Sequence, residues 1–232
     1  MRDTGANQWR SRLPVAMHML GAQHAAIFGF QEVSAEQRCD LDRELSDYRG
    51  VGDGRDGQGQ GEQCPVYVRG GFEPEASGTF WLSPTPTQPS RGWDANMPRI
   101  CTWVRYPGLT VFNTHLDFKG AESRLEALKL IRQRISGSAI VMGDFNDEEG
   151  SSALAPLADL VDAYRSVQPF DPDRDETTYH AFEGERHTGP RIDFIFVTPD
   201  LKAVEASIVR EGSASGPFPS DHRAVTVRLR KQ

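Results

Sequence analysis

The stretch Ala139-Ile140-Val141-Met142-Gly143-Asp144-Phe145-Asn146-Asp147 runs from four apolar residues directly into Gly-Asp-Phe-Asn. An unbroken apolar run of this length, preceded by Ser138 and closed by glycine, predicts a strand that is buried on both faces. Asp144 and Asn146 are two positions apart, so they project to the same side of an extended chain. Polar residues at the carboxyl end of a buried strand suit a catalytic site, but an Asx turn that ends the strand explains them equally well.

Length and charge narrow the class of protein. The chain has 232 residues, 38% of them hydrophobic, and a formal net charge of -7. No linker rich in Pro, Ser or Gly separates two cores, so we expect a single domain over residues 1–232. An acidic protein is a poor non-specific binder of long polyanions, and no dense run of Lys and Arg marks a nucleic-acid groove.

The chain shows no signal for a membrane or for a disulfide framework. Residues 1–5 contain no apolar signal region and no apolar run reaches the length of a membrane span, which predicts a cytoplasmic protein, or a secreted one if the N-terminus is truncated. The three cysteines, Cys39, Cys64 and Cys101, are odd in number and lack CxxC spacing. They predict reduced thiols rather than disulfides or a structural zinc site.

The first elements alternate between helix and strand. Residues 14–24 predict a short helix with Pro14 in its first turn, and residues 24–33 predict a buried strand that ends in Gln31-Glu32. Ser34 is a suitable N-cap, and Gln37 three residues later completes a capping box. A second helix should therefore follow the strand and continue to about residue 46.

A glycine-rich stretch comes next. Residues 52–62 predict a loop, and no Gly-Lys-Ser/Thr follows to make it a Walker loop. Residues 63–69 and 72–82 predict strands that Gly70-Gly71 would join as a hairpin.

The rest of the chain predicts more strands than helices. The expected elements are a proline-containing loop at 83–98, strands at 99–106 and 109–115 joined by Pro107-Gly108, a helix at 120–134, a short helix at 151–158 capped by Ser151 or Ser152, and strands at 191–198, 203–210 and 222–230. Strands often follow strands, so simple βαβ winding does not account for the order. We therefore expect an α+β sandwich of two sheets with helices outside.

Polar or ionisable residues interrupt or end several buried strands. These residues are Glu32, His115 with Asp117, Asp144 with Asn146, Asp193, and Asp221 with His222. A single acid at a strand end is more often a turn or a cap than a ligand. Five such cases in one domain are harder to explain independently, and an acid embedded as Ile-Asp-Phe-Ile-Phe is costly unless it is paired.

This inventory suits hydrolysis assisted by a hard cation. Carboxylates and an amide favour Mg²⁺ or Mn²⁺, whereas zinc would prefer His and Cys, and no HxxxH or HExxH motif is present. A divalent ion neutralises phosphate charge, and a histidine held by a carboxylate can transfer protons near neutral pH. A serine hydrolase would need a GxSxG motif, and a glycosidase would not need the His and Asn companions.

Five motifs occur in a recognisable order. They are QEV (31–33), NTHLD (113–117), GDFN (143–146), RIDFIF (191–196) and SDH (220–222). Each is weak alone, but together the chain resembles the endonuclease/exonuclease/phosphatase superfamily over roughly residues 24–230. GDGRDGQGQGE (52–62), FWLS (80–83), GWD (92–94) and RICTW (99–103) resemble a bacterial branch that acts on small substrates. The resemblance implies a four-layer αββα sandwich of two mixed, mainly antiparallel sheets packed face to face.

The resemblance also implies roles for individual residues. Glu32 would bind the metal, with Asp221 beside it. Asp144 and Asn146 would position the attacking water and the scissile phosphate. The remaining roles are an acid–histidine pair of Asp193 with His222, a second phosphate-facing histidine at His115, and Glu62 as its carboxylate partner.

Three further residues are candidate substrate contacts. Arg99 would contact a phosphate or the substrate, because Arg presents a bidentate fork to phosphoryl oxygens, with a surface ion pair as the alternative. Trp93 and His180 would line the pocket. Plain packing is an equally good interpretation for Trp93, as is an exposed loop position for His180.

The chain departs from the family at its start. Family members begin with a buried strand whose end carries an asparagine beside the metal glutamate, and here Met1-Arg2-Asp3-Thr4 stands where that strand should finish. The first strand is therefore expected to be missing. A truncated N-terminus, a compensated natural loss or a degenerate enzyme would each explain this departure.

The sequence predicts a Mg²⁺- or Mn²⁺-dependent phosphohydrolase that cleaves a small or soluble phosphodiester or phosphomonoester by in-line attack of water. A metal-dependent nuclease and a catalytically impaired binding module of the same fold are the alternatives. We expect a monomer with a small phosphoester substrate and no membrane partner, and nucleic acid is not favoured.

Overall fold

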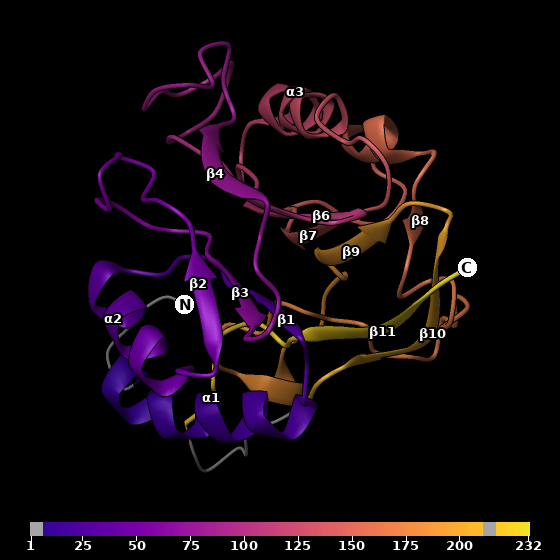
Figure 1. Cartoon of the computed structure of the whole chain (residues 1–232). Helices are drawn as coiled ribbons and strands as arrows, with labels where there is room; N and C mark the ends of the chain where they lie inside the picture. Colours follow the sequence, from indigo (N-terminus) through magenta and orange to yellow (C-terminus); the bar gives the residue numbers. More distant parts are fainter. Residues whose placement is uncertain (1–6, 211–216) are drawn as a thin grey trace.

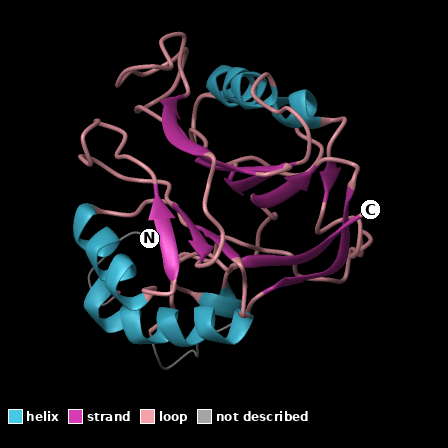
Figure 2. Cartoon of the chain, viewed as in Figure 1, coloured by secondary structure: helices cyan, strands magenta, loops and turns pink. Residues whose placement is uncertain are grey.

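Two layers of β-structure lie face to face, and helices cover both outer faces (Figure 1). The computed structural model describes residues 7–210 and 217–232. Helices α1 (Trp9–Gln23) and α2 (Ala35–Glu44) lie outside one β-layer, while α3 (Ala121–Arg132) and the 3-10 helix η1 (Ser152–Leu157) lie outside the other (Figure 2). A second short 3-10 helix, η2, spans Gly184–Arg186. This arrangement is the four-layer αββα sandwich that the sequence predicts.

One β-layer is a single six-stranded sheet. Its strands lie in the order β4 (Ala76–Trp81), β5 (Ile100–Tyr106), β6 (Leu109–His115), β7 (Ala139–Asp144), β9 (Asp193–Val197) and β8 (Val161–Asp162). Neighbouring strands are antiparallel except β6 and β7, which are parallel and are connected through α3. A crossover helix is the usual connection between parallel neighbours, and it brings the carboxyl ends of β6 and β7 to the same edge.

The other β-layer is divided into two antiparallel sheets. One contains β1 (Ile27–Gly29), β3 (Val66–Arg69) and β2 (Tyr48–Val51) in that order, and the other pairs β10 (Leu201–Ile208) with β11 (Val225–Lys231). Between residues 7 and 27 the described chain forms α1 and no strand. Residues 1–4, where the absent first strand is expected to finish, lie outside the described residues. The layer opposite β7 is thus two sheets instead of the expected one.

Three apolar clusters separate the four layers. Phe112, Leu128 and Phe145 belong to the cluster between the six-stranded sheet and α3. Val66 and Ile140 belong to the cluster between the two β-layers. The third cluster lies beneath α1 and α2 and includes Trp9, Leu41 and Tyr67. Burial on three successive levels is what holds a sandwich with helices on both faces together.

Several predicted elements are confirmed. Ser34 Oγ accepts a hydrogen bond from Gln37 N, and the Gln37 side chain accepts from Ser34 N, which completes the capping box. Strands β5 and β6 form the predicted hairpin. Helix α3, strands β7, β9, β10 and β11, and the cap at Ser151 are also present, with ends shifted by a few residues.

Other elements differ from the prediction. The hairpin through Gly70-Gly71 is wrong, because β3 already has β1 and β2 on its two edges and β4 pairs with β5 in the opposite layer. The first helix begins at Trp9, which places Pro14 inside it. The strand expected at residues 24–33 is regular only over Ile27–Gly29, and Glu32, three residues beyond its end, adopts a left-handed φ of 56°.

No helix in the described residues is both long enough and apolar enough to span a membrane.

Candidate active site

Three ionisable side chains lie in a row across the end of the six-stranded sheet. In the strand register His115 is opposite Asp144, and Asp144 is opposite Asp193. Alternation along the strands explains why all three face the interior between the β-layers. Val111 and Ile140 precede His115 and Asp144 by an even number of residues and belong to the cluster between the β-layers. The strand ends therefore bring together groups that the sequence separates widely.

The opposite layer supplies a histidine to this row. His222 Nδ1 lies 2.8 Å from Asp193 Oδ2, and its Nε2 lies 3.7 Å from Asp144 Oδ2. Burial alone would lower the pKa of His222, but the charge and hydrogen bond of Asp193, with Asp144 and Asp221, raise it to about 10. The predicted acid–histidine pair is therefore assembled, with an imidazolium between two carboxylates.

Asp144 lies at the centre of the row. Its side chain is 7% exposed. Burial, followed by the negative charge of Asp193, raises the pKa of Asp144 to about 7, and Glu32 contributes in the same direction. A buried carboxylate with a pKa near neutrality can accept a proton from water at physiological pH.

Asn146 connects this row to His115. Asn146 Nδ2 donates to His115 Nε2 at 2.9 Å and to the Leu116 carbonyl oxygen at 3.0 Å. Burial, then the positive charges of Arg99 and His222, lower the pKa of His115 well below its usual value, so the ring is neutral and Nε2 can accept. The backbone N of Asn146 also donates to Asp144 Oδ1 at 2.8 Å. The Asx turn and the active-site interpretation therefore describe the same atoms.

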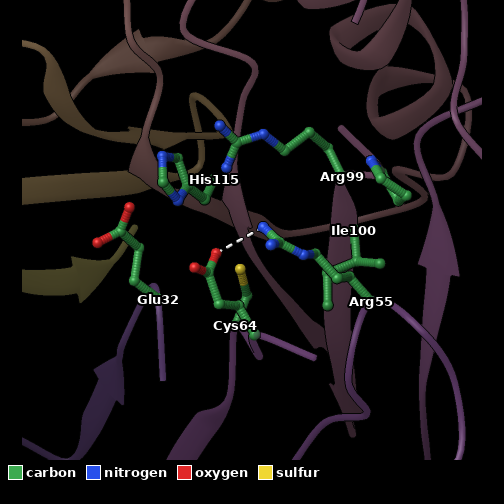
Figure 3. A pocket seen from close by; sticks show the side chains of 8 residues that line it. Glu32, Arg55, Cys64, Arg99, Ile100 and His115 are labelled. Carbon is green, nitrogen blue, oxygen red and sulfur yellow. Dashed lines mark hydrogen bonds and ion pairs between the residues drawn. The ribbon is translucent and has the colours of Figure 1, made fainter. Parts of the chain in front are cut away.

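A small cavity adjoins the row. The empty space among its lining residues, part of it open to solvent, is about 200 Å³, and these residues are Glu32, Arg55, Glu62, Cys64, Pro98, Arg99, Ile100 and His115. Figure 3 shows the Arg99 side chain extending toward His115, with Glu32 on the other side of the ring. Burial raises the pKa of the Cys64 thiol to about 12, which excludes it as a thiolate nucleophile.

Glu62 has a different partner from the one expected. Its Oε2 pairs with Arg55 Nη1 at 2.6 Å, and among the described residues the carboxylate oxygen within 4 Å of His115 is Asp144 Oδ2, at 3.4 Å. The reason is local, because the backbone N of Arg55 also donates to the Glu62 carbonyl and closes the glycine-rich loop on itself. Glu62 therefore lines the cavity as half of an ion pair.

The donor set fits a hard divalent cation. Asp144, Asp193 and His222 each offer a ligand atom within 4.8 Å of the others, and in the described part of the chain this is the group of three that does so. His222 already uses Nδ1 on Asp193, so this trio is better described as a hydrogen-bonded network. Glu32 and Asp221, the predicted metal ligands, are outside the trio but close enough to raise the pKa of Asp144 and His222 respectively. Carboxylate oxygens are the donors that Mg²⁺ and Mn²⁺ prefer.

Two residues that were predicted to line the pocket are not among the lining residues of this cavity. Trp93 is half-buried in the loop before β5, and neither it nor His180 lines the cavity. His180 is buried, which corrects the expectation of an exposed loop histidine. Its ring packs against Phe218, and its Nδ1 accepts from Gly184 N at 3.3 Å. Burial lowers the pKa of His180 to about 4, and its backbone N donates to the Asp221 carbonyl, so it supports the segment that carries His222.

Arg55 is the site residue that the sequence interpretation missed. It sits among the glycines of residues 52–62, which predict only a loop. In the structure this loop folds back on itself. A Cβ atom at Gly54 would lie 1.9 Å from Gln60 O, so only glycine fits at that position. Glycine in such numbers around one Arg was the available signal that the backbone approaches itself closely there.

Comparison with known proteins agrees with the fold and the motifs. The model of the Endonuclease/Exonuclease/phosphatase family matches residues 16–222. A solved family protein from Bacteroides thetaiotaomicron is 30% identical, with a TM-score of 0.90 over 98% of this chain and 94% of that one. A mannosyl-6-phosphatase from the same organism is also 30% identical, with a TM-score of 0.89 over 98% of this chain and 96% of that one.

A more distant structure shares the fold alone. A humanized TDP2 from D. rerio is 16% identical, with a TM-score of 0.76 over 98% of this chain and 94% of that one. A search of curated protein sequences gave no significant match. The match to the family model over residues 16–222 and the two 30% identical structures show that the chain belongs to the Endonuclease/Exonuclease/phosphatase family.

Proposed function

We propose that the protein is a metal-dependent hydrolase that cleaves a phosphoester of a small, soluble substrate by in-line attack of water. Membership in a family of phosphoester hydrolases supports the reaction class. The observation that carries the proposal is the cross-strand row of His115, Asp144 and Asp193, completed by His222 from the opposite layer.

In this proposal each residue of the row has a distinct task. Asp144, with a pKa of about 7, accepts the proton of the attacking water. Both amide hydrogens of Asn146 are committed to His115 and Leu116, so its Oδ1 is left to orient that water. The His222 imidazolium, held by Asp193, stabilises the negative charge that develops on the phosphoryl group.

In this proposal Glu32 and Asp221 would hold the cation. A divalent ion bound there would neutralise phosphoryl charge and polarise the P–O bond. Neutral His115, fixed by Asn146, keeps the adjoining wall of the site uncharged and ordered. The pairing of Asp193 with His222 prevents that histidine from rotating away from the reacting centre.

Two observations favour a small substrate over a nucleic acid. The net charge of -7 opposes binding to a long polyanion. The 30% identical mannosyl-6-phosphatase acts, by its name, on a phosphorylated sugar. The nuclease alternative predicts DNA binding that weakens steeply as salt is raised.

The test is hydrolysis of p-nitrophenyl phosphate and bis(p-nitrophenyl) phosphate by EDTA-treated protein, before and after addition of Mg²⁺ or Mn²⁺. We expect activity only with the metal, and a loss of about 10³-fold or more in Asp144→Asn and His222→Gln. Exposed Asp173→Asn is the matched control and should behave as wild type. Absence of hydrolysis with every metal and both esters would support the binding-module alternative instead.

A further inference from the structure

The cavity beside His115 contains a guanidinium whose hydrogen-bonding capacity is unused. The Arg99 side chain is 7% exposed, and its Nε has no hydrogen-bond partner. Within residues 7–210 and 217–232, no hydrogen bond from any of its five N–H groups is found. The cost of an unpaired buried donor applies to Nε, while Nη1 and Nη2, which make no hydrogen bond within the described residues and are not fully buried, are available to donate to an anion.

The other buried arginines behave differently. Arg12 donates to the Asn7 and Pro219 carbonyls, and Arg223 donates to the Thr177 and Gly184 carbonyls. Arg191 also leaves its Nε unpaired, but its Nη2 donates to Asp162. In the described part of the chain, Arg99 is therefore the buried arginine whose guanidinium donates no hydrogen bond.

The nearest carboxylate does not satisfy Arg99. Asp117 Oδ2 lies 3.5 Å from Arg99 Nε, beyond a good hydrogen bond. The oxygens of Asp117 are occupied by backbone N–H groups of Asn96, Lys119 and Gly120 at 2.9, 3.0 and 2.9 Å. Burial alone would raise the pKa of Asp117, but these amides and Arg99 lower it, so it is an anion that holds Arg99 in place.

The charges around the cavity leave Arg99 available for an anion. Glu62 is neutralised by Arg55 at 2.6 Å, His115 is neutral, and Glu32 lies at the proposed metal end. Arg55 and Arg99 both contribute positive potential at His115.

We propose that Arg99 binds a terminal phosphoryl oxygen and selects phosphomonoesters over phosphodiesters. This inference rests on the proposed phosphoester hydrolysis. A monoester at neutral pH carries nearly two negative charges and three terminal oxygens. A diester carries one charge and two such oxygens, and it would place an uncharged ester group where the third oxygen of a monoester faces Arg99. The third terminal oxygen, which only a monoester has, would accept the hydrogen bonds that Arg99 does not make within the protein.

The first test compares kcat/KM for p-nitrophenyl phosphate and bis(p-nitrophenyl) phosphate with Mg²⁺ present. We expect wild type to prefer the monoester, and Arg99→Gln to lower monoester kcat/KM by about 100-fold or more while the diester value falls less than about tenfold. Arg99→Lys, which keeps the charge but loses the fork, should fall in between. Equal losses on both esters would indicate a purely structural role and overturn the inference.

The second test measures binding of inorganic phosphate by calorimetry, with Mg²⁺ present, and needs no turnover. Phosphate should bind wild type at least about tenfold more tightly than Arg99→Gln. The matched control is Arg105→Gln, which removes a guanidinium that is 55% exposed at the other end of β5. It should bind as wild type, and its thermal unfolding gives the reference for Arg99→Gln and Arg99→Lys.

The two tests separate this inference from the proposed function. If no ester is hydrolysed but phosphate binding still depends on Arg99, the anion subsite stands and the proposed function fails. If esters are hydrolysed with wild-type selectivity and phosphate binds equally well in Arg99→Gln, the function stands and the inference fails.

Discussion

His222 Nδ1 lies 2.8 Å from Asp193 Oδ2, and this contact decides which nitrogen of the ring faces the reacting centre. The other nitrogen, Nε2, is turned toward Asp144 Oδ2 at 3.7 Å. The two residues come from different β-layers, Asp193 from the first position of β9 and His222 from the segment before β11. The contact therefore links the layers and also orients the histidine that is proposed to be catalytic.

Removing the charge of Asp193 should disable His222. Asp193→Asn keeps the side-chain shape but removes the charge that raises the pKa of His222. We expect kcat to fall by about 10³- to 10⁴-fold, as when the carboxylate behind a catalytic histidine is lost. NMR titration of the His222 ring should show its pKa well below the wild-type value of about 10. An unchanged ring pKa would contradict the pairing.

The pH dependence of kcat/KM should be bell-shaped. Activity requires Asp144 deprotonated, so it should rise with pH through about 7, and it requires His222 protonated, so it should fall as pH approaches about 10. The two groups interact, so the limbs report the pair rather than single residues. The profile is measured with saturating Mg²⁺, which should move the rising limb to lower pH because a cation favours the carboxylate.

Asp144 should cost the protein stability at neutral pH when no cation is present. Its pKa is about 7 in the folded protein and about 3.9 when unfolded, so its favourable contribution is full below pH 4 and is lost as pH rises to 7. Urea unfolding at pH 8 in EDTA should show Asp144→Asn more stable than wild type by roughly 1–3 kcal/mol. The difference should vanish near pH 4, and wild-type stability that does not depend on pH here would count against a raised pKa.

Gly143 should be irreplaceable, because it precedes Asp144 and its backbone lies directly against Thr114 of β6. A Cβ at Gly143 would lie 1.9 Å from Thr114 O, and its φ is +145°. Gly143→Ala should cost about 3–5 kcal/mol in urea unfolding and displace Asp144 from His115. The matched control is Gly137→Ala, with φ +75° and nothing within 4 Å, which should cost only about 1 kcal/mol. Similar costs at the two positions would argue against the close approach.

Glu32→Gln should raise the metal requirement. Glu32 lines the cavity and is the predicted ligand beside Asp144. We expect the Mg²⁺ concentration for half-maximal activity to rise by about tenfold or more, because a carboxylate ligand becomes a neutral amide. Activity at saturating Mg²⁺ should recover in part. If the Mg²⁺ dependence of Glu32→Gln equals that of wild type, Glu32 is not a ligand of the cation.

Sequence reasoning succeeded where a residue's environment is set by its own strand. The apolar run before Asp144 and the alternating strands before His115 and after Asp193 predicted buried strands that end in polar groups, and the register brings those ends together. Periodicity is a local property, and the parallel pairing of β6 with β7 follows once α3 is recognised as the crossover.

Sequence reasoning failed where the position of a residue depends on contacts with distant parts of the chain, such as which strands already pair with the two edges of a neighbouring strand. Gly70-Gly71 has the chemistry of a hairpin turn, yet β1 and β2 already flank β3, so the chain must cross to the other layer. Glu62 was expected beside His115, but Arg55 of the same loop takes its carboxylate. The burial of Arg99 without a hydrogen bond could not be read from its neighbours in sequence either.

The reactive groups are divided between two β-layers. The rate of turnover should therefore depend on the spacing between those layers. Glu32 and His222 belong to one layer, while His115, Asp144 and Asp193 belong to the other. Mild denaturant or hydrostatic pressure that parts the layers by a fraction of an ångström would separate these groups while each sheet keeps its own ladder. Activity should therefore be lost before circular dichroism detects any loss of secondary structure. The change in tryptophan fluorescence should also come after the loss of activity.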